Sequence, residues 1–570
     1  MKRIIAVLLL VTGFVSVTAE SRRRAIRSPG GGTLPVANFI DSQIGAKLST
    51  SGIAPAPIAG DDEFLRRVTL DLTGTIPTSA DVVVFLADSR TDKRARKIDE
   101  LLRSEAFNDR WTMWFGDLVQ NVQVANNSRE YYIGKNVYYT DIRSAIRSGK
   151  PYDQMVREVL AGEGSNFQTG VANYVVRQLQ RNGPPQDTLD NLAAHSAEKF
   201  LGIPMLCISC HNGLGHLELV NGWLREKKRD DFWKMAAFFA RTTARGSRYT
   251  DPTNPNANVI RFDVGVNPNG EYLLGSTDGN KSPRYVAPGS SNVVTPAFIT
   301  TGETPRPGEP YRVAYGRMLT ADRQFARATM NLLWKEMFGR GLVEPVNAFD
   351  LSKLDTQPSH PQLLEALADE LIARGYNLRE VLRTMASSNA YQLSSQYAGT
   401  QPDASYFARR APRRLQSEVL FDAIAAATGV PGQFPVNGAA AVPKAMQLPD
   451  PVDGGRRGPS ATFLNNFGRG NRDDVMRTND AAITQSLSLM NDTLVTSRVK
   501  RTGNSTVQKV LAASSDPATI TDQLYLATLS RHATAQEKQI ASSYLGAGPL
   551  NERTEDLQYV LLNSLEFLFN

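Results

Sequence analysis

The chain contains two cysteines, and both lie in one pentapeptide, Cys207-Ile208-Ser209-Cys210-His211. The pattern C-x-x-C-H is the attachment sequence of c-type haem. Its two thiols form thioether bonds with the porphyrin, and the adjacent histidine binds the iron as the proximal ligand. The sequence therefore predicts a covalent haem c held by Cys207, Cys210 and His211, in a protein that transfers electrons.

Three other roles for these residues stay open. Cysteines one helical turn apart could form a local disulfide, although so short a loop would add only about 2 kcal/mol to stability. A redox-active C-x-x-C is typical of a thioredoxin-like context, which the surrounding sequence does not predict. Zinc is the third alternative, because His216 lies five residues after His211. Adjacent ligands at Cys210 and His211, however, leave little chain to surround a zinc ion.

A distal ligand on the far side of the iron would come from a neighbouring helix. Helical periodicity predicts helices over 188–202 and 231–241, which place His195 before the motif and Met235 after it. Met205 and His216 are too close to the motif in sequence to reach the opposite face easily. A histidine ligand would give a low potential, methionine a higher one, and an open position would permit small-molecule or peroxide chemistry.

Haem attachment of this type requires export, and the N-terminus predicts it. Lys2 and Arg3 precede a mostly apolar stretch, and Val17-Thr18-Ala19 is a small-residue cleavage site. We therefore expect a signal peptide over 1–19. The apolar stretch is too short to span a membrane, and we predict no transmembrane segment after cleavage. The expected location is the periplasm, the cell surface or the extracellular space.

Composition indicates an ordinary soluble globular protein, with 41% hydrophobic and 21% charged residues among 570. Two cysteines in so long a chain exclude a disulfide-rich scaffold. The formal net charge of +7 raises the question of nucleic-acid binding. Part of this excess is Arg22, Arg23, Arg24 and Arg27, just after the expected cleavage site, and an exported protein rarely meets nucleic acid. We predict no nucleic-acid partner.

Apolar residues recur at helical spacing through most of the chain, as in Phe64, Leu65, Val68 and Leu72, which predicts a mainly α fold. Between 242 and 307 Gly, Pro, Asn, Ser and Thr dominate, with short β-like runs. We expect two helical domains separated by this loop-rich insertion with a few short strands. The predicted units are a linker over 20–58, a motif-bearing helical domain over 59–241, the insertion over 242–307 and a second helical domain over 308–570.

An unusual basic cluster lies in the second half of the chain. Arg409, Arg410, Arg413 and Arg414 surround Pro412, which predicts a helix start where positive charge opposes the helix dipole. Arg414 could pair with Glu418, four residues on. We expect a solvated, internally paired face rather than an anion site.

Several short motifs together resemble a known family. In the first half they are Phe64-Leu65-Arg66-Arg67-Val68-Thr69-Leu70-Asp71-Leu72-Thr73-Gly74, Pro77-Thr78, Arg110-Trp111 and Phe200-Leu201-Gly202 leading into C-x-x-C-H. In the second half they are Asn331, Trp334, Phe338-Gly339-Arg340-Gly341-Leu342-Val343, Pro358-Ser359-His360-Pro361, Ser394-Ser395, Phe467-Gly468-Arg469, Leu489-Met490-Asn491, Leu524-Tyr525-Leu526, Asn563-Ser564 and Glu566-Phe567-Leu568-Phe569-Asn570. The first set resembles the planctomycete-type cytochrome-like domain, and the second resembles its usual companion, the planctomycete-specific C-terminal domain.

Both domains have unknown function, so the resemblance implies little beyond the motif itself. It implies an exported protein, a haem held by Cys207, Cys210 and His211, and a possible sulfatase-like exported partner. The chain departs from the common family pattern directly after the motif, where it has Asn212-Gly213-Leu214-Gly215-His216. The immediate surroundings of the haem and the distal ligand therefore cannot be inferred from relatives.

Three functional hypotheses follow from the sequence. The first is an exported mono-haem protein that passes electrons to a redox partner. The second is a non-redox surface or polysaccharide-interaction protein, in which Cys207 and Cys210 form a disulfide. The third is a haem enzyme with an open iron position, or a hydrolase that uses carboxylates the sequence does not single out.

Overall fold

The structure, a computed structural model, describes residues 39–125, 128–129, 132–180, 183–252, 254–275, 284–286, 288–453, 458–473, 475–480 and 482–570. The predicted signal peptide, residues 1–19, lies outside this range. The fold is mainly α, as predicted, with 54% helix against 7% strand. Within the described ranges, no helix is both long enough and apolar enough to cross a membrane.

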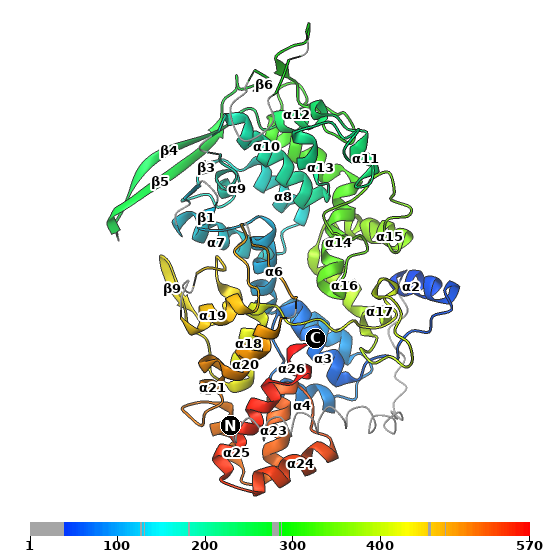
Figure 1. Cartoon of the computed structure of the whole chain (residues 1–570), viewed down its shortest axis with the longest axis vertical. Helices are drawn as coiled ribbons and strands as arrows, with labels where there is room; N and C mark the ends of the chain where they lie inside the picture. The colour runs from blue at the N-terminus through cyan, green and yellow to red at the C-terminus, as the bar shows by residue number, and fades with distance from the viewer. Residues whose placement is uncertain are drawn as a thin grey trace.

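The first half of the chain is mostly helical, and its helices lie in both the upper and the lower parts of the molecule (Figure 1). They are α2 (Phe39–Thr50), α3 (Asp61–Thr73), α4 (Ser79–Ala87), α5 (Lys93–Leu102), α6 (Glu105–Leu118), α7 (Tyr132–Ser148), α8 (Tyr152–Ala161), α9 (Ala172–Arg177), α10 (Pro185–Ser196), the π-helical turn η2 (Ala197–Leu201), the 3₁₀ helix η3 (Met205–Ser209), α11 (Gly222–Arg225) and α12 (Arg229–Ala237). Helix α2 lies within the segment that the sequence predicts as a linker over 20–58. It is ordered because Ile40, Ile44 and Leu48 bury one face in the core.

The two longest strands, β4 and β5, follow α12 directly, and the described strands are spread over three parts of the chain. They are β1 (Val124–Ala125), β2 (Ser128–Arg129), β3 (Gly164–Ser165), β4 (Thr242–Asp251), β5 (Asn254–Val266), β6 (Tyr272–Leu273), β7 (Val293–Val294), β8 (Phe434–Val436) and β9 (Ala439–Val442). All pairs are antiparallel, and the one three-stranded sheet among the described residues has the order β3-β5-β4. Strands β4 and β5 pair from Thr242↔Val266 outward and form a ribbon that projects from the body (Figure 1).

The second half of the chain is again helical. Its elements are α13 (Tyr311–Ala321), α14 (Arg323–Phe338), α15 (Pro361–Ala373), α16 (Leu378–Ser387), α17 (Asn389–Gln392), η4 (Ala404–Tyr406), α18 (Ser417–Thr428), η5 (Ala445–Gln447), α19 (Pro459–Asn466), α20 (Ile483–Asn491), α21 (Thr493–Arg498), α22 (Thr506–Ala513), α23 (Pro517–Leu529), α24 (Ala535–Gly546), α25 (Leu550–Leu562) and α26 (Leu565–Leu568).

The hydrophobic core does not divide at residues 242–307, where the amino-acid composition changes. One cluster of buried side chains joins helices α2 to α12 with helices α13 to α17. A second cluster begins near Leu415, includes most of the C-terminal helices and takes Leu70, Ile76 and Met113 from the first half. Helices α13 to α17 therefore pack with the motif-bearing half rather than with the helices that follow them.

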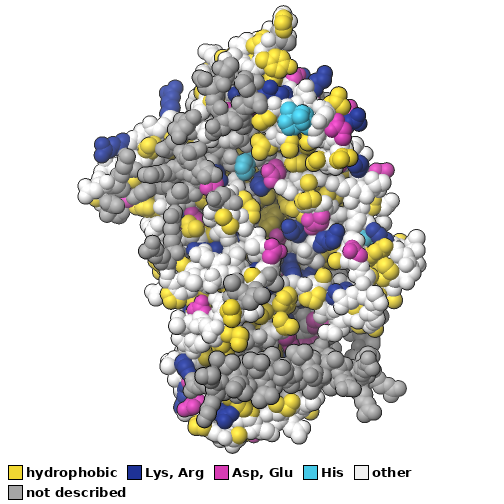
Figure 2. All heavy atoms as spheres, in the orientation of Figure 1, with side chains coloured by type: hydrophobic (Ala, Val, Ile, Leu, Met, Phe, Trp, Pro, Cys, Tyr) yellow, Lys and Arg dark blue, Asp and Glu magenta, His cyan; other side chains and the backbone are white. Residues whose placement is uncertain are grey.

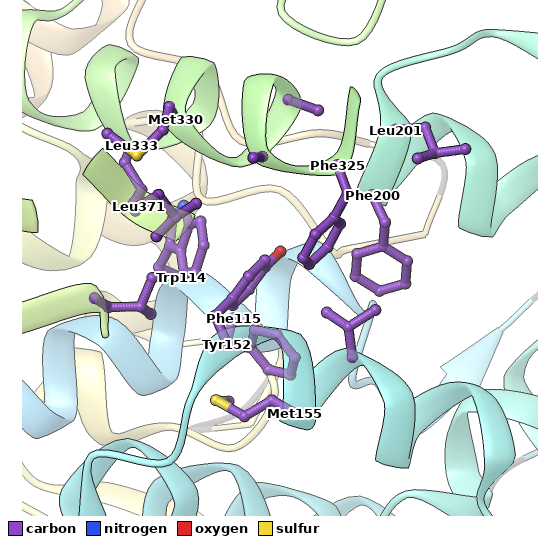
Figure 3. Close-up of a cluster of buried hydrophobic side chains, with 14 of the residues drawn as sticks. Trp114, Phe115, Tyr152, Met155, Phe200, Leu201, Phe325, Met330, Leu333 and Leu371 are labelled. Carbon is purple, nitrogen blue, oxygen red and sulfur yellow. The ribbon is translucent and has the colours of Figure 1, made fainter. Parts of the chain in front are cut away.

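Aromatic side chains carry much of this shared packing (Figure 3). Tyr152 at the start of α8 stacks on Phe325 of α14, with ring centroids 5.5 Å apart and planes 9° from parallel. Trp114 and Phe115 of α6 contact the same tyrosine ring at 6.1 and 6.0 Å. Offset and edge-to-face aromatic pairs add to the energy of simple burial. Residues about 170 positions apart thus form one continuous core layer.

Candidate functional site: the C-x-x-C-H loop

A change of helical pitch presents the motif to solvent. Helix α10 ends in the π-helical turn η2, a feature that is often found at functional sites. Gly202 then takes a left-handed conformation, with φ of 66°. A Cβ atom there would lie 2.7 Å from the Phe349 ring, so this position requires glycine for both backbone angle and space. After this turn the chain enters the 3₁₀ helix η3, which carries Cys207.

The two thiols of the motif lie at the molecular surface. Cys207 is exposed and Cys210 is half-buried, and no disulfide joins these two described residues. Arg229 of α12 lies beside them, donating from Nε to the Ser209 carbonyl at 3.3 Å. Burial lowers the pKa of this guanidinium, while the negative charge of a Cys210 thiolate acts in the opposite direction. Both sulfur atoms are therefore placed where a reagent or a prosthetic group could reach them.

The imidazole of His211 is oriented by the backbone of the next residue. Its Nδ1 lies 2.9 Å from the carbonyl oxygen of Asn212. A carbonyl only accepts hydrogen bonds, so Nδ1 carries the proton and Nε2 keeps its lone pair. Histidines that bind metals show this same arrangement, since the outer hydrogen bond fixes the tautomer and the ring. The side chain thus has the tautomer that a proximal iron ligand needs.

The loop after the motif returns His216 to His211. The ring centroids of the two histidines are 4.1 Å apart, with planes 36° from parallel. Gly213 permits this fold, because a Cβ atom there would lie 1.9 Å from the Leu224 carbonyl oxygen, and its N–H donates to Lys227 at 2.8 Å. Within the described chain, no three His, Cys, Asp or Glu side chains converge as a metal-ion site.

Large apolar side chains around the motif are exposed. Leu206, Leu214, Leu219 and Val220 have exposed fractions between 56% and 102%. In Figure 2 histidine side chains stand at the surface near the top of the molecule, in the region of α11 and α12 in Figure 1. So many exposed leucine and valine side chains in one short loop are characteristic of a surface that binds another apolar body.

The family relationship agrees with the motif. Residues 39–244 match PSCyt2, a protein family of unknown function (DUF1549), and residues 312–545 match PSD1, also of unknown function (DUF1553). The chain belongs to these paired families. The resemblance to the planctomycete-type cytochrome-like pair is thereby confirmed. No curated protein and no solved structure matches the chain.

Both predicted distal candidates belong to the PSCyt2 domain, on helices α10 and α12 that pack against η3. Burial, and then Lys199, lower the pKa of His195 to about 4, so its imidazole is neutral at physiological pH. Met235 is fully buried, and its Sδ accepts a hydrogen bond from the backbone N–H of Ile299 at 3.3 Å. His195 therefore has a lone pair available, whereas Met235 would have to give up a hydrogen bond.

The PSD1 domain holds the loop that follows the motif. Asp350 accepts hydrogen bonds from the backbone N–H groups of Gly222 and Trp223, at 2.8 and 2.9 Å. Burial alone would raise the pKa of Asp350, but these bonds and one from Ser352 lower it below its ordinary value. No periodicity or motif in the sequence identifies Asp350. Asn221 could have been identified, because it caps α11 by accepting from the Leu224 N–H at 2.9 Å.

The prediction of a solvated arginine face is wrong. Arg410 and Arg414 are buried, and Arg410 and Arg413 both form ion pairs with Asp71 of α3. The predicted pair of Arg414 with Glu418 does not form, since Glu418 pairs with Arg477. Arg410 and Arg413 therefore join the PSD1 domain to the PSCyt2 domain, whereas Arg414 donates to backbone carbonyls within the PSD1 domain.

Proposed function

We propose that this protein is an exported mono-haem c-type protein that transfers electrons at the periplasm or cell surface. Cys207 and Cys210 would hold the porphyrin by thioether bonds, and His211 would bind the iron through Nε2. When bound, haem c supplies one-electron chemistry at its iron. The observation that carries the proposal is the hydrogen bond from His211 Nδ1 to the Asn212 carbonyl, which leaves Nε2 available beside two accessible thiols.

The apolar surroundings of the motif support the same conclusion. A porphyrin has two large apolar faces, and burying them against leucine and valine side chains is favourable at about 25 cal/mol per Å². Leu206, Leu214, Leu219 and Val220 are exposed and lie within 14 positions of one another, in the loop that contains the motif. They would pack on the macrocycle and exclude water from it, which is one of the means by which a protein sets a haem potential.

The contact of the His216 ring with the His211 ring gives this site a feature that the sequence did not predict. His216 is exposed and lies against the ring of the proximal candidate. We infer that it orients the His211 ring and does not bind the iron, because it lies on the same side of the motif. For the distal position His195 is favoured over Met235, since Met235 Sδ already accepts a hydrogen bond, whereas the His195 imidazole is neutral and no described residue is seen to hydrogen-bond to it.

Expression with the c-type maturation system and a pyridine haemochrome spectrum test the proposal. We expect one covalent haem per chain that survives denaturation. Cys207→Ala and Cys210→Ala together should abolish this haem, whereas Ser209→Ala, between the two cysteines, should retain it. His211→Ala should leave the covalent bonds possible but change the iron spectrum.

A colourless protein after maturation would contradict the proposal. If the same protein contained a Cys207–Cys210 disulfide, reducible by two electrons, the non-redox surface or polysaccharide-binding hypothesis would replace it. Spectral changes on adding cyanide or peroxide would instead indicate an open iron position and a haem enzyme. Fractionation of cells that express the full chain would test the proposed export, and a redox partner or sulfatase-like partner could then be sought by cross-linking at the exposed motif.

A further inference from the structure

A pocket of about 470 Å³ lies outside the motif region. It is enclosed by the C-terminal end of α8, the start of β4, the end of β5 and the segment that leads into α13. This volume is within the range of small-molecule sites. Its walls combine apolar surface, from prolines, Val266 and Tyr311, with the charged residues Arg241 and Arg306.

Two of the three arginines that line this pocket, Arg241 and Arg306, form no ion pair with a described residue. The Arg241 guanidinium lies 3.9 Å from the centroid of the Tyr311 ring, and its buried Nε has no hydrogen-bond partner. In the described part of the chain, no carboxylate forms an ion pair with Arg241 or with the exposed side chain of Arg306. A guanidinium held against an aromatic face with unused donors is a ready partner for an oxyanion.

The acidic residues of the pocket are already engaged. Glu309 accepts from Arg317 at 2.8 and 2.9 Å, and this arginine lowers the pKa of Glu309 to about 2. Glu163 lies 3.5 Å from Arg312 and is half exposed. Glu309 also accepts from the backbone N–H of Arg306 at 3.0 Å, and the charge of Arg306 contributes to lowering its pKa, so Arg241 is the pocket arginine whose charge is left most available for a ligand.

The start of α13 adds to this positive field, whereas the charge of Arg312 is paired with Glu163. Arg312 is 5% exposed, and its Nη1 donates to the Gly162 carbonyl at 2.7 Å, closing the end of α8. Its Nη2 is also buried and lies 3.5 Å from the carboxylate of Glu163, its ion-pair partner. Helix α13 begins at Tyr311 behind Pro310, with no side-chain cap for its first N–H groups. Free N–H groups at a helix start favour negative charge.

We propose that this pocket binds a small organic oxyanion, a carboxylate or a sulfate ester carried on a ring of about monosaccharide size. The oxyanion is bound by Arg241 and Arg306 near the start of α13. The ring lies against the proline and valine walls and Tyr311. The site lies apart from the cysteine motif, and it belongs to the junction of the β4–β5 ribbon with the PSD1 domain.

Titration calorimetry on the full chain tests this proposal with four probes: D-glucuronate, D-glucose 6-sulfate, neutral D-glucose and inorganic sulfate. We expect one or both ring oxyanions to bind, and glucose not to bind. Arg241→Gln should weaken binding about tenfold or more, because it removes a charged hydrogen-bond donor. Arg245→Gln is the matched control, since Arg245 is exposed on β4, four residues after Arg241, but lies outside the pocket, and this variant should bind like the native protein.

Several results would overturn the proposal. One is the absence of binding by either ring oxyanion at a ligand concentration of about 10 mM, because a small-molecule site of this size should bind with higher affinity than that. Another is equal binding of glucose, since the charge would then contribute nothing. Inorganic sulfate that binds as tightly as the sulfate ester would mean an adventitious ion only. Unchanged affinity in Arg241→Gln would place the ligand elsewhere, and Arg306→Gln provides a second variant should Arg241→Gln fold poorly.

Discussion

Asp71 is the residue whose replacement tests the packing of the two domains most directly. Its carboxylate is 3% exposed and lies in α3 of the PSCyt2 domain. It accepts hydrogen bonds from Tyr391 at 2.8 Å, Arg410 at 2.9 Å and Asn570 at 2.7 Å, and it pairs with Arg413 as well. Burial alone would raise its pKa, but Arg410 and Arg413 hold the pKa below its ordinary value, so the group is charged.

Asp71→Ala leaves two arginines without their carboxylate, one of them almost fully buried. Breaking a buried ion pair by removing one partner costs about 3–5 kcal/mol, because the remaining charge is desolvated and unpaired. We expect a decrease of that size in the free energy of unfolding, measured by urea denaturation with tryptophan fluorescence. Asp71→Asn should cost less, since it keeps the shape and some of the acceptors.

The control is Arg96→Ala, whose ion pair with Asp92 is exposed on both sides. It should change stability by less than about 1 kcal/mol. Adding Arg413→Ala to Asp71→Ala should cost less than Arg413→Ala does alone, with a coupling of at least about 1 kcal/mol. A loss under about 1 kcal/mol for Asp71→Ala, or purely additive effects, would refute the view that this network joins the domains.

Three further predictions concern other parts of the molecule. Asp350→Ala should speed amide hydrogen exchange across Gly222–Arg225 about tenfold or more, because lost acceptors for buried N–H groups cost about 1–3 kcal/mol. The control Asp355→Ala, at an exposed position, should leave this exchange unchanged. Equal exchange in the two variants would contradict the role of Asp350. Burial raises the pKa of Asp422 to about 7, so its contribution to stability is complete below about pH 4 and is lost as the pH rises to about 7. The urea midpoints of the native protein and of Asp422→Asn should therefore converge at low pH. Between about pH 4 and pH 7 the midpoint of the native protein should fall more steeply with pH than that of the variant, and parallel curves would refute this. Phe325→Ala should lower the free energy of unfolding by about 3–5 kcal/mol in the same assay, and a loss below about 1 kcal/mol would mean that the shared aromatic layer is dispensable.

Local sequence patterns predicted the helices well and the packing between them poorly. The helix expected over 188–202 is α10, Pro185–Ser196, continued by η2, Ala197–Leu201, and the helix expected over 231–241 corresponds to α12, Arg229–Ala237. Phe64, Leu65, Val68 and Leu72, which recur at helical spacing, all lie in α3 and are buried. Such features depend on residues within one or two turns, which a sequence displays directly.

The failures concern partners that are far apart in sequence. The charges of Arg410 and Arg413 suggested solvent exposure, but Asp71, more than 300 positions away, compensates them in the interior. Likewise the π-helical turn before the motif has no signature in residue type, and Asp350 has no local signal at all. The motif itself was identifiable, because its chemistry requires fixed residue types at fixed spacing.

The aromatic layer around Tyr152 has a consequence for how the chain is made. Tyr152 emerges from the ribosome about 170 residues before Phe325, on which it stacks. At about 5–20 residues per second, that interval lasts about 10–35 s, during which the first half has no partner for its apolar face. Each half of the chain buries apolar side chains of the other. If the two halves were produced as separate proteins, part of the hydrophobic core of each would be exposed to solvent. The cysteine pair at 207 and 210 is synthesised within this interval, before the interior closes around the helices that carry it.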